Sequence, residues 1–400
     1  SGLATIATLS NSADTAALLE NKTISFEAAG GNADTALEGV VVDMSGTQIN
    51  SIGTTYRKAY DGSKVNAGIA KVETGTVSVN FGGLEITGMN VTANSLIASG
   101  AEYQDEGDNG YPGGSYAFTY GLFGTVHADE GDTVTISNLK ISNVNANLTG
   151  ATQMVNGDSV VAVSDMAGIV VGYTQGNVVL ENITIDGASA EGEQGLFEGY
   201  DGVAALVGRA YGNQSAGYTE HLTLRNCTVR DLQINGQRRA AGFVSYASRD
   251  IIVDIENCEM ENVNIRSRRQ DDKVKDMYVG VFGHFANGTE LNIDDVTLTN
   301  VTADAGFSTN GGVTWAPIYE IMKDQTPFLD YAFYLKDGNL YLPLVYTDRV
   351  ISTATDCTSV SFGSAGLSLT FNGSTYTLSG RSFTYGEGSQ ADVTSVFTKA

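Results

Sequence analysis

The stretch VTISNLKISNVN, residues Val134–Asn145, and the stretch VVLENITIDGAS, residues Val178–Ser189, follow one twelve-residue form. That form is h-x-h-x-[NDG]-h-x-h-x-[NDG]-h-x, in which h is an apolar residue. Four further copies begin at Val79, Leu222, Val253 and Leu291. Each copy reads as three very short alternating strands separated by turn-forming residues. A unit this small cannot bury its apolar face alone, so the repeat predicts stacked coils of β-strands.

Equivalent positions of the copies form columns. One apolar column contains Leu84, Leu139, Ile183, Cys227, Cys258 and Val296. One turn column contains Gly83, Asn138, Asn182, Asn226, Asn257 and Asp295. The number of residues between copies varies while the pattern stays constant, so the insertions must lie in loops. We therefore expect an all-β parallel solenoid whose function resides on its surface.

A second motif precedes most copies. It reads YGLFGTV, AGIVVGY, AALVGRA, AGFVSYA and VGVFGHF, at Tyr120–Val126, Ala167–Tyr173, Ala204–Ala210, Ala241–Ala247 and Val279–Phe285. These segments are apolar and rich in glycine, so we expect each to add a further strand to its coil. Their glycines would permit tight turns or a close approach of backbones.

The repeats do not cover the whole chain. Residues 1–20 include a short predicted helix at 12–20 and form an expected N-terminal cap over the first coil. Residues 21–315 form the predicted solenoid. Residues 316–400 contain two hairpin signals, at Asp337-Gly338 and Asn372-Gly373. We expect this last part to be a separate antiparallel β module that caps the stack.

Composition narrows the classes of partner. The 400 residues include 46 acidic and 22 basic side chains, giving a net charge of −24. A nucleic-acid-binding surface needs the opposite sign, so we expect no nucleic acid as partner. No apolar run of about 20 residues is present, so we expect no membrane-spanning segment.

The segment GVFGHFANGTELNIDDVTLTNVTA, residues Gly280–Ala303, resembles the GLUG-type repeats of bacterial surface and adhesin-like proteins. The resemblance extends over residues 65–310 and implies a right-handed parallel β-helix. It also implies an extracellular or cell-surface bacterial protein, with stacked asparagines in an internal hydrogen-bonded ladder. Asn138, Asn182, Asn226 and Asn257 match the ladder positions, and Asp295 departs from them. Pectate-lyase-like enzymes share the same broad architecture.

Residues that often perform chemistry are few and scattered. Cys227 and Cys258 are neighbours in one column, and we expect two buried free thiols, with a disulfide as the alternative. The three histidines, His127, His221 and His284, fall in different columns and are expected to pack without a catalytic or metal-binding role. Asp294 and Asp295 are adjacent and point to opposite faces of a strand, so they cannot flank one glycosidic bond. We expect no catalytic residues and no metal site.

Two loops combine acidic and aromatic side chains. The first, Ala101–Tyr116, carries Tyr103 and Tyr111 among four carboxylates. The second carries Glu191, Glu193, Glu198 and Asp201 with Phe197 and Tyr200. Such loops can bind calcium or stack on sugar rings, although their spacing does not match the EF-hand. No cofactor is expected, with calcium kept as an alternative, and solvated loops are the simpler interpretation.

Two later loops are basic in this acidic chain. The residues concerned are Arg238, Arg239, Arg266, Arg268, Arg269 and Lys273. Because the loops interrupt consecutive coils, we expect them to lie side by side. An arginine guanidinium can form two parallel hydrogen bonds with one carboxylate, so these residues could hold an acidic glycan. A charge network with neighbouring carboxylates is the alternative.

These observations favour a non-catalytic, extracellular, adhesin-like or glycan-binding protein whose partner is a carbohydrate or a cell-surface protein. The alternative is a secreted polysaccharide lyase or hydrolase that acts on acidic glycans. A lyase would require an arginine or lysine base beside the bound sugar acid, and the basic loops contain candidates.

Overall fold

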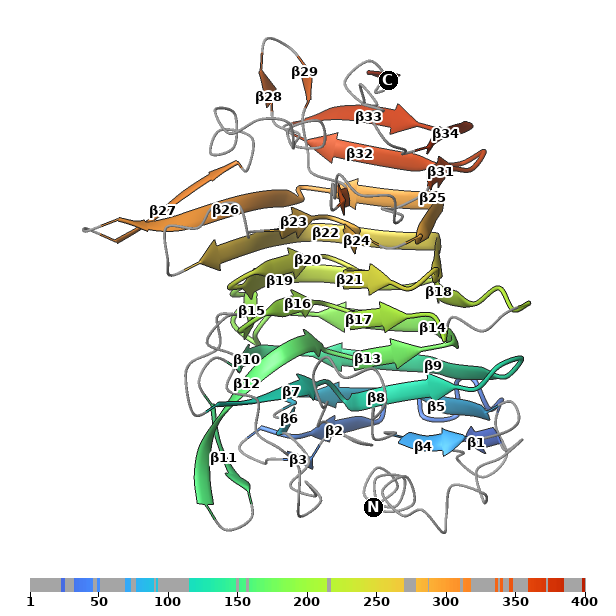
Figure 1. Cartoon of the computed structure of the whole chain (residues 1–400), viewed down its shortest axis with the longest axis vertical. Coiled ribbons are helices and arrows are strands. Elements are labelled where there is room, and N and C mark those ends of the chain that lie inside the picture. Colours follow the sequence, from blue (N-terminus) through green and yellow to red (C-terminus); the bar gives the residue numbers. More distant parts are fainter. Residues whose placement is uncertain are drawn as a thin grey trace.

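The computed structural model shows a chain built of strands, most of which run parallel to their neighbours (Figure 1). The residues it describes are 23–25, 32–45, 49–50, 69–72, 77–89, 91–92, 115–148, 151–155, 158–213, 217–269, 278–286, 288–309, 312–317, 335–336, 339–340, 345–347, 359–371, 373–384 and 398–399. Within these ranges there is no helix, and the all-β prediction is confirmed. The cap predicted at residues 1–20 lies outside them.

Three large sheets and two small ones contain the strands. The six-stranded sheet contains β7 (Ser115–Tyr120), β11 (Ala151–Val155), β12 (Asp158–Gly168), β16 (Gly202–Ala204), β20 (Arg239–Ala241) and β23 (Tyr278–Gly280). The seven-stranded sheet contains β4 (Ile69–Val72), β8 (Phe123–Ala128), β13 (Val171–Gln175), β17 (Val207–Tyr211), β21 (Val244–Ser248), β24 (Gly283–Phe285) and β30 (Val345–Thr347). The small sheets pair β3 (Ile49–Asn50) with β6 (Val91–Thr92) and β28 (Leu335–Lys336) with β29 (Asn339–Leu340).

The largest sheet has 18 strands and is called the long sheet below. Its members are β1 (Thr23–Ser25), β2 (Val41–Asp43), β5 (Val77–Thr87), β9 (Thr133–Ser142), β10 (Asn145–Asn147), β14 (Asn177–Asp186), β15 (Gly195–Gly199), β18 (His221–Arg225), β19 (Thr228–Gly236), β22 (Ile252–Arg269), β25 (Glu290–Thr299), β26 (Thr302–Thr309), β27 (Gly312–Pro317), β31 (Ser359–Phe362), β32 (Leu367–Phe371), β33 (Ser374–Leu378), β34 (Arg381–Thr384) and β35 (Thr398–Lys399).

The chain visits the three large sheets in a fixed order. It leaves β12 for β13, continues through β14 and β15 of the long sheet, and returns to the six-stranded sheet at β16. There β16 lies parallel to β12, with Gly202 opposite Met166, and β17 then lies parallel to β13. Figure 1 shows the successive coils stacked along the long axis of the molecule. Strands far apart in the sequence are therefore neighbours, at the usual spacing of about 4.8 Å.

The inward side chains of the long sheet form the core. Ile183 pairs in register with Leu139. Thr184 pairs with Thr228 in the next coil, so Cys227, the residue before Thr228, lies beside Ile183 in the column. All three column residues are at most 2% exposed. Burial of one such aliphatic side chain contributes roughly 1.5–3 kcal/mol. The predicted column is therefore continuous through these coils.

The long sheet bends at residues with a left-handed backbone. Asn138, Asn182, Asn226, Asn257 and Asp295 have φ between 49° and 59°. A second bend follows at Asn143, Asp231, Asn262 and Asn300. Asparagine and aspartate tolerate this conformation better than other residues with a Cβ. The bends divide the sheet into three segments, called the first, second and third segments in chain order.

The first copy departs from the predicted alignment. We aligned Val79 with Val134, but Val77 pairs with Val134 and Val79 pairs with Ile136. The register then shifts, and Leu84 again pairs with Leu139. Gly82 and Gly83 both have positive φ, which lets the chain absorb the extra residues in a tight bend. Hydrophobic pattern alone could not reveal this insertion because Phe81 is also apolar and buried.

The glycine-rich motif supplies the further strand predicted for each coil, in the seven-stranded sheet, and also forms the corner that precedes this strand. In Ala167–Tyr173, β12 ends at Gly168 and β13 begins at Val171. Ile169 and Val170 between them are both almost fully buried, although they are consecutive. A Cβ on Gly168 would lie 2.2 Å from the carbonyl oxygen of Val171. The glycine is therefore required by the close backbone approach at the corner between the six- and seven-stranded sheets.

The stack continues beyond residue 315, where we predicted that it ends. β31 and β32 pair in parallel with β25, with Val360 opposite Leu291 and Leu369 opposite Leu298. β30 likewise pairs with β24. Both predicted hairpins are confirmed: β28 pairs with β29, and β32 pairs with β33, each in antiparallel fashion. Residues of the predicted separate module therefore supply another coil, and β33 and β34 cover its edge.

Candidate functional site

The asparagine column forms a chain of side-chain hydrogen bonds. Each amide nitrogen donates to the amide oxygen one coil earlier, at 2.8 Å from Asn182 to Asn138, 3.0 Å from Asn226 to Asn182 and 2.6 Å from Asn257 to Asn226. Asn182, Asn226 and Asn257 are exposed, so this ladder lies on the outer surface and not inside the stack. The resemblance to repeats with an internal ladder is wrong on that point.

Both ends of the ladder have a chemical explanation. Asn138 also donates to Asn80 at 3.0 Å, and Asn80 donates to the carboxylate of Asp34 at 2.9 Å. The carboxylate of Asp34 has no N–H with which to donate a further hydrogen bond, so the chain of side-chain hydrogen bonds ends there. At the other end no side-chain hydrogen bond joins Asn257 to Asp295 among the described residues, because a carboxylate cannot donate to an amide oxygen.

Arg239, one of the basic residues predicted to bind a ligand, is buried in the interior of the protein. Its Nη1 lies 2.8 Å from Asp201 Oδ1, its Nε donates to His284 Nδ1 at 3.2 Å, and its guanidinium lies 4.8 Å from the centre of the Tyr246 ring. Arg239 is 8% exposed and Asp201 is 4% exposed. This buried cluster joins the six-stranded sheet to the seven-stranded sheet. Arg239 is therefore unsuited to bind a ligand from solvent, which corrects its prediction as a binding residue.

The backbone of Arg238 contacts the residue that follows Arg266. Ser267, next to Arg266, donates its hydroxyl to the carbonyl oxygen of Arg238 at 2.9 Å. Both arginines are half-buried. The backbone of Arg268 and Arg269 continues β22 opposite Gly306 and Phe307, but their side chains lie outside the description. The predicted site residues Lys273, Tyr103 and Tyr111 lie outside the described residues altogether.

The outer face of the third segment carries a continuous polar network, which we call the amide strip. It contains Asn147, Glu198, Gln233, Asn235 and Arg266. Asn147, Glu198, Asn235 and Arg266 pair in register across four consecutive coils. The pattern of alternating strands places them on one face because every second side chain points outward. The strip includes only two predicted site residues, Arg266 and the loop residue Glu198.

Hydrogen bonds hold the amide strip in one arrangement. Glu198 accepts from Asn147 at 3.3 Å and from Asn235 at 2.9 Å. Gln233 donates to Asn235 at 3.2 Å and accepts from Arg266 Nη1 at 3.3 Å. Each bond joins side chains that are already placed by the β-ladder, so little further conformational entropy is lost. The result is a fixed surface with amide donors, a carboxylate and a guanidinium.

The second acidic loop does not present an aromatic platform. Phe197 is 4% exposed and packs in the core, and Asp201 is the buried partner of Arg239. Glu198 points outward between them and joins the amide strip. A strand that begins at Gly195 imposes this alternation, whereas we had predicted a loop at this position. The alternative of sugar stacking is therefore wrong for Phe197, and the solvated loop favoured here is instead a strand.

His221 has a specific partner that the sequence did not suggest. Its Nδ1 lies 2.6 Å from Asp254 Oδ2, and the second carboxylate oxygen accepts from Asn292 at 2.7 Å. The hydrogen bond with Asp254 raises the pKa of His221 above its ordinary value, against the effect of partial burial. Burial disfavours ionised Asp254, but hydrogen bonds from His221 and Asn292 outweigh it and lower the pKa of that carboxyl. The three residues link three consecutive coils.

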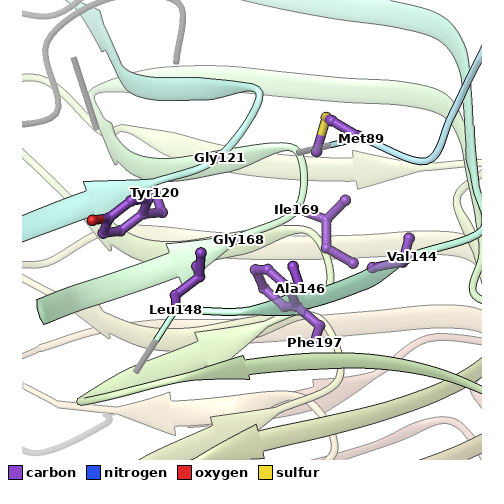
Figure 2. A pocket seen from close by; sticks show the side chains of 9 residues that line it. All are labelled: Met89, Tyr120, Gly121, Val144, Ala146, Leu148, Gly168, Ile169 and Phe197. Carbon is purple, nitrogen blue, oxygen red and sulfur yellow. The ribbon is translucent and has the colours of Figure 1, made fainter. Parts of the chain in front are cut away.

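An apolar recess opens beside the start of the third segment. It is lined by Met89, Tyr120, Gly121, Val144, Ala146, Leu148, Gly168, Ile169 and Phe197. Figure 2 shows apolar side chains surrounding it from several strands, and no charged side chain lines it. Its empty volume is about 350 Å³, with solvent at its mouth included. The recess offers apolar contact and no acid, base or nucleophile apart from one tyrosine.

Metal-binding side chains do not come together in groups of three within the described ranges. Nor does any helix of that part of the chain have the length and apolarity needed to cross a membrane. The chain matches no protein-family model, no curated protein and no solved structure. Only the residues themselves therefore indicate the function.

Proposed function

We propose that the stack is a right-handed parallel β-helix and that the chain is a non-catalytic, adhesin-like, carbohydrate-binding protein at the bacterial cell surface or outside the cell. The observation that carries this proposal is the amide strip. The strip is flat because its side chains project from one segment of a sheet. It is also rigid, since its members are connected by hydrogen bonds across coils.

The chemistry of the strip suits sugar hydroxyls. A hydroxyl both donates and accepts, and the strip offers amide N–H donors from exposed Asn147 and half-buried Gln233 beside the acceptor oxygens of Glu198. A preordered surface binds with a smaller entropic cost than flexible loops do. Arg266 adds a cation to the strip, so the preferred glycan carries carboxylate groups.

A binding role is favoured over polysaccharide cleavage because two described residues suited to catalysis, Arg239 and Asp294, have other partners. Arg239, a candidate base, is enclosed with Asp201 and His284. Asp294 accepts the backbone N–H groups of residues 365 and 366, both at 2.9 Å. Such contacts hold side chains in structural positions and leave them away from a bound sugar.

The test begins with an array of neutral and uronate-containing oligosaccharides, followed by calorimetric titration of the best ligand. We expect Arg266→Gln to weaken binding of an acidic glycan by roughly tenfold or more, because a hydrogen bond to a charged group contributes about 1.5–3 kcal/mol. Asn147→Ala should weaken the binding of acidic and neutral glycans alike. Arg230→Gln is the matched control, since Arg230 lies on β19, beside the strand of Arg266, but pairs with Asp186 on the second segment.

Two results would overturn the proposal. One is the absence of binding to every acidic and neutral glycan on the array. The other is an equal loss of affinity from Arg230→Gln and Arg266→Gln, which would indicate a diffuse charge effect. Release of unsaturated products from a uronate polymer would instead establish the lyase alternative.

A further inference from the structure

Cys227 and Cys258 occupy the same inward position in consecutive coils. The flanking pairs are Arg225 with Glu256 and Thr228 with Glu259, so the two cysteines are in register. Neighbouring strands lie about 4.8 Å apart, and disulfides join residues whose Cα atoms are about 4.4–6.8 Å apart. The backbone already holds the two cysteines at a distance that a disulfide can span.

The two sulfur atoms also share an environment. The backbone N–H of Cys227 donates to Cys258 Sγ at 3.4 Å, which places that sulfur directly over the neighbouring cysteine. Both thiols are free in this structure, at 0% and 2% exposure. The column continues with Ile183 on one side and Val296 on the other, so the pair is enclosed by aliphatic side chains.

The two thiols differ in acidity. Hydrogen bonds from the side chain of Cys227, opposed by burial and supported by the Cys227 backbone N–H, lower the pKa of the Cys258 thiol. Burial raises the pKa of the Cys227 thiol well above its ordinary value. The thiolate is the reactive form in disulfide exchange.

We propose that Cys227 and Cys258 form a redox site in which thiol–disulfide exchange closes a disulfide between consecutive coils. This inference is independent of carbohydrate binding. The site takes a small disulfide, such as glutathione disulfide, as its oxidant. The product links residues 31 positions apart in the chain and clamps β19 to β22.

The chemistry balances in two steps. The thiolate of one cysteine attacks one sulfur of the small disulfide, forming a mixed disulfide and releasing one thiolate. The sulfur of the other cysteine, after losing its proton, then attacks the protein sulfur of the mixed disulfide and releases the second thiolate. The two cysteine thiols lose two electrons in total, the oxidant gains two, and the two protons pass to the released thiolates.

The closed form has a structural cost and a gain. Cys227 Sγ lies 3.4 Å from the carbonyl oxygen of Arg225 and 3.5 Å from that of Leu180, and its rotation toward Cys258 gives up these weak contacts. The crosslink in turn restricts the unfolded chain. Because both sulfurs are buried, exchange must pass through local opening of the coil and will be slow under native conditions.

The experiment uses the full chain with Cys357→Ser, so that the pair contains the only thiols. The folded protein is incubated with glutathione disulfide, and intact mass and peptide mapping follow the products. We expect loss of both thiols without retained glutathione, a Cys227–Cys258 linkage, a rise in Tm of several degrees and reversal by dithiothreitol. Persistent free thiols, under conditions that oxidise the unfolded chain, would overturn the proposal, as would a fall in Tm on oxidation.

Two further variants test the second step. Valine fits this column at Val296, so Cys227→Val and Cys258→Val should both keep the fold. Each variant keeps one thiol of the pair and should therefore accumulate a stable glutathione adduct. A stable adduct on the protein with both thiols would show that the second cysteine does not displace glutathione and would overturn the proposal.

Discussion

Replacement of Asn226 by alanine tests whether the external ladder stabilises the stack. The side chain of Asn226 donates to Asn182 at 3.0 Å and accepts from Asn257 at 2.6 Å. Its backbone is left-handed, with φ of 53°. The substitution therefore removes two side-chain hydrogen bonds and also places a Cβ residue without a polar side chain in a strained conformation.

The expected magnitude follows from these two effects. Each hydrogen bond contributes about 0.5–1.5 kcal/mol net, and the exposure of the amides favours the lower end of that range. The left-handed backbone costs alanine about 1 kcal/mol more than asparagine or glycine. We expect Asn226→Ala to lower the free energy of unfolding by about 2 kcal/mol. Asn226→Gly, which relieves the strain but also lacks the amide, should lower it by about 1 kcal/mol.

Urea titration followed by circular dichroism measures both variants against the wild type. The glycine variant isolates the hydrogen bonds, and the difference between the two variants isolates the backbone strain. Wild-type stability in Asn226→Gly would show that the ladder contributes nothing. Equal stabilities of the glycine and alanine variants would refute the argument from backbone conformation.

Three further outcomes are expected. Asp295→Asn supplies the missing donor of the ladder and should raise the unfolding free energy by about 0.5–1.5 kcal/mol in urea titration, and an unchanged midpoint would contradict this. Arg239→Met leaves the charge of Asp201 buried without its ion-pair partner and should cost about 3–5 kcal/mol, whereas a loss below about 1 kcal/mol would show that the pair is dispensable. The folded-state pKa of His221 is raised by Asp254, so its stabilising contribution is complete below about pH 6.5 and is lost as pH rises through the folded-state pKa. The difference in Tm between wild type and His221→Gln should therefore shrink as pH rises above about 6.5, and a constant difference would rule out this linkage.

The repeat pattern predicted most of the long sheet. Alternation of apolar and polar residues assigns Leu139 and Ile183 to the same inward column because strand side chains alternate with a period of two. The asparagines between strands predicted bends, since few residues adopt a left-handed backbone. Both C-terminal hairpins followed from local turn chemistry at Asp-Gly and Asn-Gly. Each of these features depends on residues close together in the chain.

Features that depend on contacts between coils could not be predicted from the sequence. The segment Ser359–Phe371 has the inward pattern of another coil, but an intervening hairpin signal favoured a separate module. The buried role of Arg239 depends on Asp201, His284 and Tyr246, which come from neighbouring coils and a different sheet. The sequence predicted Arg239 to be a surface cation, because the charge of a side chain does not show whether it is buried.

The sequence by itself determined that the chain stacks short strands in register, because a twelve-residue apolar repeat cannot be satisfied by one unit. Only the tertiary structure decided which polar side chains meet, since each coil contributes one residue to every surface column. The amide strip, the His221–Asp254 pair and the facing thiols of Cys227 and Cys258 all arise between coils 31 to 51 residues apart in the chain. These contacts depend on the register between successive coils. Because the loops between coils differ in length, the linear sequence does not show which polar residues become neighbours.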